Sequence, residues 1–163
     1  MDAYFFDTSA LIKRYIEEPG RLTVRSIINT PPIPDLHIVG ITRVEMASAL
    51  SRLALAPHAD VTLMREALAS FESDFPGDFS VIAITPELLD DAARFAQRHA
   101  LRAYDAIQLA GCIELNQFRL HDSLPLAPLV SSDAALNDAA LAEGLPVINP
   151  EIADASGSVR EPQ

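Results

Sequence analysis

The sequence lacks the residues on which most disulfide and zinc sites depend. It has one cysteine, Cys112, in 163 residues, so an internal disulfide and a cysteine-rich zinc site are both excluded. The four histidines, His37, His58, His99 and His121, show no metal-ligand spacing such as His-x-x-x-His. A lone thiol fits a protein of the reducing cytoplasm.

Long apolar runs and several catalytic motifs are also missing. No stretch reaches the roughly 18 apolar residues of a membrane span. Asp2 precedes the first apolar segment and no basic residue does, so we do not expect a signal peptide. Neither Gly-x-x-x-x-Gly-Lys-Ser/Thr nor Gly-x-Ser-x-Gly occurs, which argues against a P-loop enzyme and a serine hydrolase.

Positive charge is scarce. Twelve Lys and Arg residues stand against 23 Asp and Glu, giving a formal net charge of −11. A protein that coats duplex nucleic acid would carry a basic surface, so that class is disfavoured. The acidic excess permits a basic protein partner, or a site in which metal ions offset carboxylates. Every basic residue except Lys13 is arginine, which suits bidentate contacts to phosphate, although a GC-rich genome is the simpler explanation.

Apolar residues are plentiful, at 49% of the chain, and the length predicts one domain over residues 1–150. Residues 151–163 are expected to form a frayed C-terminal tail. The hydrophobic pattern alternates strands and helices, which predicts an α/β fold with a central parallel sheet of about five strands and helices on both faces. The expected strands are 3–7, 36–41, 79–84, 126–130 and 146–148. The expected helices are 9–18, 22–28, 42–56, 60–71, 85–99, 104–116 and 134–143.

Four acidic residues fall at the junctions of these elements. Asp7 ends the first strand, Glu45 follows the second strand, Asp105 opens a helix, and Asp133 follows the fourth strand. Ligands of open parallel sheets bind beyond the carboxyl ends of the strands. The four carboxylates, from four distant segments, are therefore expected to converge at one edge of the sheet.

Helix capping gives each acid a simpler explanation. Thr42 and Glu45 have the spacing of a capping box, and Asp7 and Asp133 could accept hydrogen bonds as N-caps. An acid in a first helical turn also gains roughly 0.3–1 kcal/mol from the helix dipole.

Asp105 is the acid that capping explains least. It lies on a helix that is apolar nearly all round, where a carboxylate needs a partner, and Arg102 is the only cation nearby in the sequence. If four carboxylates meet, their repulsion raises their pKa values unless a cation binds. Oxygen ligands favour one or two magnesium or manganese ions, which activate water for phosphoester hydrolysis. Asp7 is not followed two residues later by the second aspartate that an aspartyl-phosphatase would use as its acid. Covalent phosphoryl transfer through Asp7 is therefore disfavoured.

The segments FFDTSALI, ITRVEMASAL, LRAYDAIQLA and VSSDAALNDAALAEGLPVINP, in that order, resemble the PIN domain, and specifically the VapC-type toxins of type II toxin–antitoxin systems. The resemblance runs from residue 1 to about residue 150. It implies a Mg- or Mn-dependent endoribonuclease with a central parallel sheet. The acidic cluster implied to hold the metal and carry catalysis is Asp7, Glu45, Asp105 and Asp133.

Some assignments within the resemblance stay open. Ser131, Asn137 or Asp138 could share the work of the fourth acid, and the hydroxyl of Thr8 or Ser9 would support metal or water. The resemblance further implies a homodimer and a cognate antitoxin that covers the active-site groove. The preference for RNA rests on the resemblance alone, because no residue here identifiably reads a 2′-hydroxyl.

A second interpretation is a PIN-like module that binds a metal or a partner without cutting. The presence of all four acids argues against it. Apolar stripes on the expected helices 42–56 and 60–71 fit either the core or a surface for the second subunit or the antitoxin.

Overall fold

The computed structural model describes residues 2–156. The strands are β1 (Ala3–Phe6), β2 (Asp35–Val39), β3 (Ser80–Ile82), β4 (Leu129–Val130) and β5 (Val147–Ile148). The helices are α1 (Thr8–Leu11), the 3₁₀ helix η1 (Ile12–Arg14), α2 (Arg21–Asn29), α3 (Thr42–Ala54), α4 (Val61–Asp78), α5 (Pro86–His99), α6 (Ala103–His121), α7 (Ala134–Ala142) and α8 (Pro150–Ala155).

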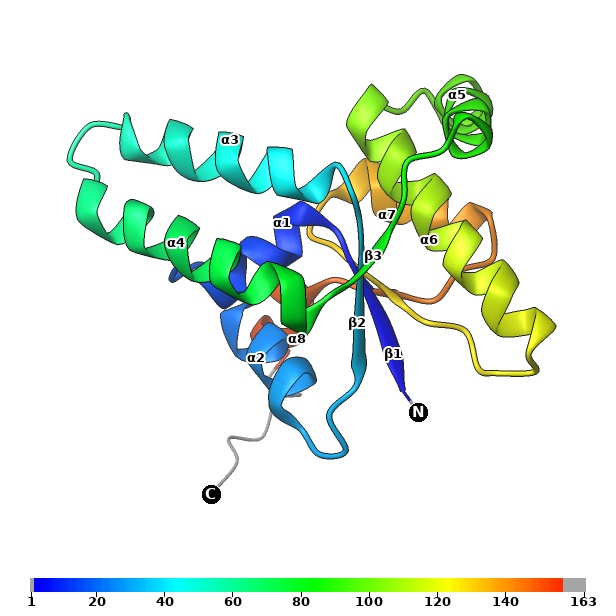
Figure 1. The fold of residues 1–163 in the computed structure, drawn as a ribbon, viewed down its shortest axis with the longest axis horizontal. Coiled ribbons are helices and arrows are strands. Elements are labelled where there is room, and N and C mark those ends of the chain that lie inside the picture. The colour runs from blue at the N-terminus through cyan, green and yellow to red at the C-terminus, as the bar shows by residue number, and fades with distance from the viewer. Residues whose placement is uncertain (1, 157–163) are drawn as a thin grey trace.

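The five strands form one parallel sheet in the order β3-β2-β1-β4-β5, which confirms the predicted fold class. The chain moves outward from β1 through β2 and β3, then returns to the other side of β1 with β4. The strand order therefore reverses between β1 and β4, where open parallel sheets bind their ligands. In Figure 1 the carboxyl ends of the central strands point upward, toward the starts of α3 and α6.

Successive residues of β1 serve opposite faces of the sheet. Phe5 belongs to a core that includes Leu88 of α5 and Leu109 of α6. Phe6 belongs to a separate core that includes Leu50 of α3 and Phe71 of α4. Helices cover both faces, as Figure 1 shows, and this is why the strands have apolar residues at nearly every position instead of alternating with polar ones.

Helix α6 packs closely on the sheet at Gly111. A Cβ built there would lie 3.1 Å from Cβ of Val39 and 3.4 Å from the ring of Phe5. The missing side chain lets the helix backbone approach β1 and β2, which fixes the position of the α6 start above the strand ends.

Replacing Gly111 with leucine is expected to destabilise the protein by about 1–3 kcal/mol, because the added carbons overpack this contact. Thermal unfolding followed by circular dichroism measures the loss. Gly77→Leu is the matched control, since a Cβ at Gly77 meets nothing within 4 Å. Equal melting temperatures for the two variants would contradict close packing at Gly111.

The first helix is shorter than expected, and its lysine is buried. The sequence predicts a helix over 9–18, whereas α1 ends at Leu11 and a 3₁₀ turn follows. Lys13 is only 3% exposed, and its Nζ lies 2.9 Å from Glu151 and 3.3 Å from Glu18. Glu151 lies 138 positions after Lys13 in the sequence, so the local hydrophobic periodicity does not indicate this ion pair.

Two helices are longer than predicted. Helix α4 continues past Phe71 and through Pro76 to Asp78, because Phe75 extends the apolar face and packs edge-on against Phe71, with ring centroids 5.7 Å apart. Helix α6 runs on to His121. Within residues 2–156, no helix is both long and apolar enough to cross a membrane.

The apolar stripes on α3 and α4 divide between core and surface. Met46 and Leu50 of α3 are buried in the core, whereas Leu63 of α4 is 41% exposed. Leu55, just beyond α3, is 86% exposed. The apolar stripes of α3 and α4 thus contribute to the core near the sheet and leave apolar side chains exposed where α3 ends and α4 begins.

The expected frayed tail is wrong in its first part. Residues 150–155 form α8, which Asn149 caps by accepting from the Glu151 N–H at 3.0 Å. Asp154 accepts hydrogen bonds from the N–H (2.8 Å) and hydroxyl (2.6 Å) of Thr23, fastening α8 to α2. Residues 157–163 of the expected tail lie outside the described residues.

Candidate active site

The first acid, Asp7, sits at the point where the strand order reverses. It follows β1 and caps α1, and it is only 5% exposed. Its Oδ2 accepts hydrogen bonds from the Ser9 N–H at 3.1 Å, the Ser9 hydroxyl at 2.5 Å and the Ser131 hydroxyl at 3.1 Å. Burial raises the pKa of Asp7, and these hydrogen bonds oppose the rise.

Glu45 is held by side chains from two other segments. Its Oε2 accepts from the Thr8 hydroxyl at 2.8 Å and from Nε2 of Gln108 at 2.6 Å. The capping-box expectation is wrong: Ile41 precedes α3 without a side-chain cap, and Thr42 accepts from Gln108. Burial raises the pKa of Glu45, and the charges of Asp7 and Asp105 raise it further.

Asp105 lies in the first turn of α6, and its carboxylate makes no hydrogen bond or ion pair with any of residues 2–156. Desolvation, followed by the negative charges of Asp133 and Asp7, raises its pKa to about 6, against a small opposing effect of Arg102. The site thus contains a carboxylate that its neighbours destabilise in the charged form. This is the arrangement that a bound cation would relieve.

Asp133 approaches the same edge from the other side of the reversal point. It follows β4, and its Oδ1 caps α7 by accepting from the Leu136 N–H at 2.8 Å. Its backbone N–H donates to the Ser131 hydroxyl at 3.0 Å, which in turn donates to Asp7. Ser131 therefore links Asp7 and Asp133. The charge of Asp133 also raises the pKa of Asp105, which places Asp133 near that acid as well.

The alternatives for the fourth position separate clearly. Ser131 lies between Asp7 and Asp133, as described. Asn137 donates through Nδ2 to the carbonyl of Ser131 at 2.9 Å, so it steadies that turn. Asp138 is exposed and lines a different pocket with Leu141 and Ile152. Of the three, only Ser131 contacts an acid of the cluster through its side chain.

The oxygen-only cluster has the donor chemistry for magnesium or manganese. Among residues 2–156, however, no three His, Cys, Asp or Glu side chains are grouped so that they could hold an ion as they stand. Magnesium keeps several waters and often takes only one or two carboxylates from the protein. Burial and neighbouring carboxylates raise the pKa values of both Glu45 and Asp105, which fits such an ion, because its charge would offset the repulsion.

A cavity of about 290 Å³ opens beside the acids. Glu45 and Asp105 line it together with Thr8, and both polar and apolar side chains from α3 and α6 complete it: Ile41, Val44, Ser48, Arg52, Arg102 and Tyr104. The two acids therefore face space that a ligand can enter.

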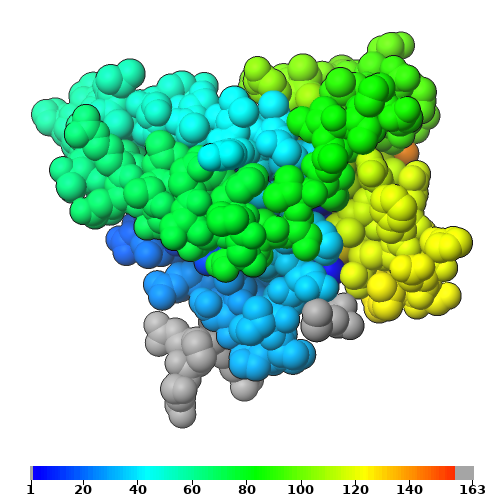
Figure 2. Space-filling model, viewed as in Figure 1, coloured from blue at the N-terminus to red at the C-terminus, as the bar shows by residue number. Residues whose placement is uncertain are grey.

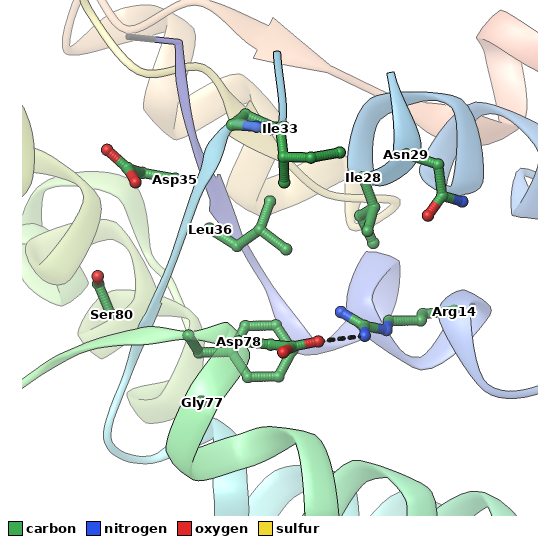
Figure 3. Close-up of a pocket in the computed structure, with 11 residues that line it drawn as sticks. Arg14, Ile28, Asn29, Ile33, Asp35, Leu36, Gly77, Asp78 and Ser80 are labelled. Atoms are coloured by element: carbon green, nitrogen blue, oxygen red, sulfur yellow. Dashed lines mark hydrogen bonds and ion pairs between the residues drawn. The ribbon is translucent and has the colours of Figure 1, made fainter. Parts of the chain in front are cut away.

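A second cavity, of about 480 Å³, lies at the other end of the sheet, where β2 and β3 begin. Figure 3 shows Arg14 reaching across it to Asp78, at 2.5 Å. Leu36 and Ile28 supply apolar walls. This cavity contains none of the four predicted acids, so it is separate from the candidate site.

Gln108 is a buried polar residue of the candidate site that was not predicted from the sequence. It is fully buried, and its Nε2 donates to Glu45, Thr8 and Thr42 from the second turn of α6. A signal was present: Gln108 is a polar residue one helical turn after Asp105 on an otherwise apolar helix. A buried amide in such a place needs polar partners.

Comparisons with known proteins agree with this architecture. The family model of the PIN domain matches residues 4–141. FitAcB from Neisseria gonorrhoeae superposes with a TM-score of 0.59 at 16% identity, covering 90% of this chain and 97% of that one. No match was found among curated protein sequences.

Two further solved structures share the fold. A toxin–antitoxin complex from Klebsiella pneumoniae gives a TM-score of 0.51 at 23% identity, covering 90% of this chain and 97% of that one. VapBC2 from Rickettsia felis, bound to a DNA fragment from their promoter, gives 0.56 at 13% identity, covering 90% and 98%.

Proposed function

Because the chain belongs to the PIN domain family, we propose that it is a metal-dependent endoribonuclease and the toxin of a toxin–antitoxin pair. The observation that carries the proposal is the meeting of Asp7, Glu45, Asp105 and Asp133 at the reversal point of the sheet. The likeness to the Klebsiella pneumoniae toxin–antitoxin complex and to VapBC2 supports the toxin assignment.

Asp7, Glu45 and Asp105 would hold magnesium or manganese, with Asp133 completing the set. When bound, the ion would lower the pKa of water and offset the negative charge that grows on the phosphate. The chain's own task is positioning. Ser9 and Ser131 fix one oxygen of Asp7 through hydrogen bonds, while Thr8 and Gln108 fix one oxygen of Glu45.

The remaining partners follow from the toxin assignment. We propose a homodimer in the cytoplasm and a cognate antitoxin with a basic segment, since the net charge of −11 favours a cationic partner. A neighbouring gene for a small protein with a DNA-binding half and a basic tail would fit this assignment.

Growth of an expressing bacterium tests the toxin assignment. Expression of the wild type is expected to arrest growth, and Asp7→Asn is expected to abolish the arrest at the same protein level. Co-expression of the neighbouring small gene should restore growth. Unimpaired growth with soluble wild-type protein would overturn the assignment.

The non-catalytic alternative is a PIN-like module that binds a metal or partner, and one observation favours its partner-binding form. Within the described chain the acids are not grouped closely enough to hold an ion unaided. Incubation of the purified protein with RNA, and with DNA of the same sequence, separates the two functions. Cleavage of RNA in magnesium or manganese supports the enzyme, and intact RNA in both supports the module.

Replacing Gln108 with leucine is expected to shift the acid side of the pH–rate profile to higher pH. Hydrogen bonds from Gln108 lower the pKa of Glu45, so their loss lets Glu45 stay protonated to higher pH. RNA cleavage at pH 5.5 should fall by more than cleavage at pH 8. Gln117→Leu, at an exposed position of the same helix, should leave the profile unchanged; identical profiles for both variants would exclude this role.

A further inference from the structure

Two arginines beside the acids have no carboxylate partner. Arg52 and Arg102 line the 290 Å³ cavity with Glu45 and Asp105, yet neither guanidinium group makes an ion pair or hydrogen bond with any described residue. Other arginines of this acidic chain do pair with carboxylates, namely Arg14, Arg21, Arg43, Arg94 and Arg98. The two guanidinium groups at the cavity thus keep their donors free for another anion.

Arg102 is near enough to Asp105 to lower its pKa slightly, but not near enough to form an ion pair. Its charge therefore acts at the mouth of the site without neutralising the acid there. Free guanidinium groups next to carboxylates suit a ligand that carries phosphates, since arginine contacts phosphate through a planar fork of N–H groups.

The same cavity has an exposed apolar wall. Tyr104 is 57% exposed and Val44 is 62% exposed, and both line the cavity with Ile41. Glu45 and Asp105 line the same cavity, so Tyr104 lies beside these two acids. Figure 2 shows the α3 surface (cyan) adjoining the segment around the start of α6 (yellow-green). An exposed aromatic beside free arginines is the combination that binds single-stranded nucleic acid.

We propose that this cavity binds an unpaired nucleotide adjacent to the scissile phosphate, with its base stacked on Tyr104 and its phosphates held by Arg52 and Arg102. The inference rests on the proposed ribonuclease function and adds to it the residues that would recognise the nucleotide beside the scissile phosphate. Bases inside a duplex are stacked on their neighbours and do not reach an aromatic side chain.

Steady-state cleavage of a single-stranded RNA oligonucleotide by the full-length protein tests the subsite. Tyr104→Ala is expected to raise KM at least fivefold, because stacking contributes about 1–3 kcal/mol per base, whereas Tyr104→Phe keeps the ring and stays near the wild type. Arg102→Gln and Arg52→Gln should each lower the slope of log affinity against log salt by about one. Arg65→Gln, at an exposed position of α4 without an ion pair in the described chain, is the control.

The outcomes separate this subsite from the function on which it rests. If the wild type cleaves RNA but the alanine and glutamine variants match Arg65→Gln in KM and salt slope, the subsite is wrong and the nuclease stands. If the variants instead lose only binding of the antitoxin, the cavity binds protein and the subsite is also wrong. If the wild type cleaves no RNA, both inferences fail together.

Discussion

Replacing Asp105 with asparagine is expected to lower the rate of RNA cleavage at least about a hundredfold, the typical cost of removing one group that stabilises charge in a transition state. Asp105 is half-buried, and its pKa is raised to about 6 by desolvation and by the charges of Asp133 and Asp7. The amide keeps the shape and removes the charge that would hold the metal. Single-turnover cleavage of a labelled RNA with manganese measures the effect.

Asp138→Asn is the matched control for this experiment. Asp138 is an exposed acid on α7 that faces a different pocket, so its loss changes the net charge equally and should leave cleavage near the wild-type rate. Both variants should melt cooperatively, which shows that the fold survives. Wild-type rates for Asp105→Asn would remove this carboxylate from the catalytic site.

Manganese or magnesium is expected to raise the melting temperature of the wild type and to have little effect on Asp105→Asn. A ligand that binds only the folded state adds about 2.7 kcal/mol of stability at 100 times its dissociation constant. The increase should grow with pH, since ionised carboxylates are the ligands. Thermal unfolding between pH 5 and 8, with and without metal, measures it.

Without metal, Asp105 makes the stability of the folded protein fall as pH rises, which is the reverse of the usual effect of an aspartate. The folded-state pKa of Asp105 is about 6, above the ordinary value of 3.8, so the folded protein binds this proton more tightly than the unfolded chain. Its contribution to stability is complete below pH 3.8 and is lost as pH rises through about 6. Asp105→Asn should remove this loss of stability, so the variant should melt above the wild type at pH 8. A lower melting temperature would contradict a raised pKa at Asp105.

The sheet was predictable because its strands are continuous apolar runs that end at polar junctions. Asp7 and Asp133 were placed correctly by one rule, that parallel strands present their carboxyl ends at a common edge. Their capping role was predicted on the same residues and is confirmed by the bonds to Ser9 and Leu136. Capping and the proposed metal binding do not compete at these positions, because a cap uses one carboxylate oxygen and leaves the other available.

The remaining contacts depend on pairs that are distant in sequence. Glu45 matched a local capping box, yet its partners are Thr8 and Gln108, at separations of 37 and 63 residues. Lys13 is buried because its ammonium group pairs with Glu151 of α8, 138 residues further along the chain. Periodicity reports which face of an element is apolar, but not which buried polar groups meet across elements.

The most direct test of a metal-dependent site at this sheet edge is RNA cleavage by the purified wild type, first with manganese, then after EDTA, then with manganese restored. We expect cleavage to stop when the metal is removed and to resume when it returns. Cleavage that continues unchanged in EDTA, or RNA that stays intact with both manganese and magnesium, would show that Asp7, Glu45, Asp105 and Asp133 do not form such a site.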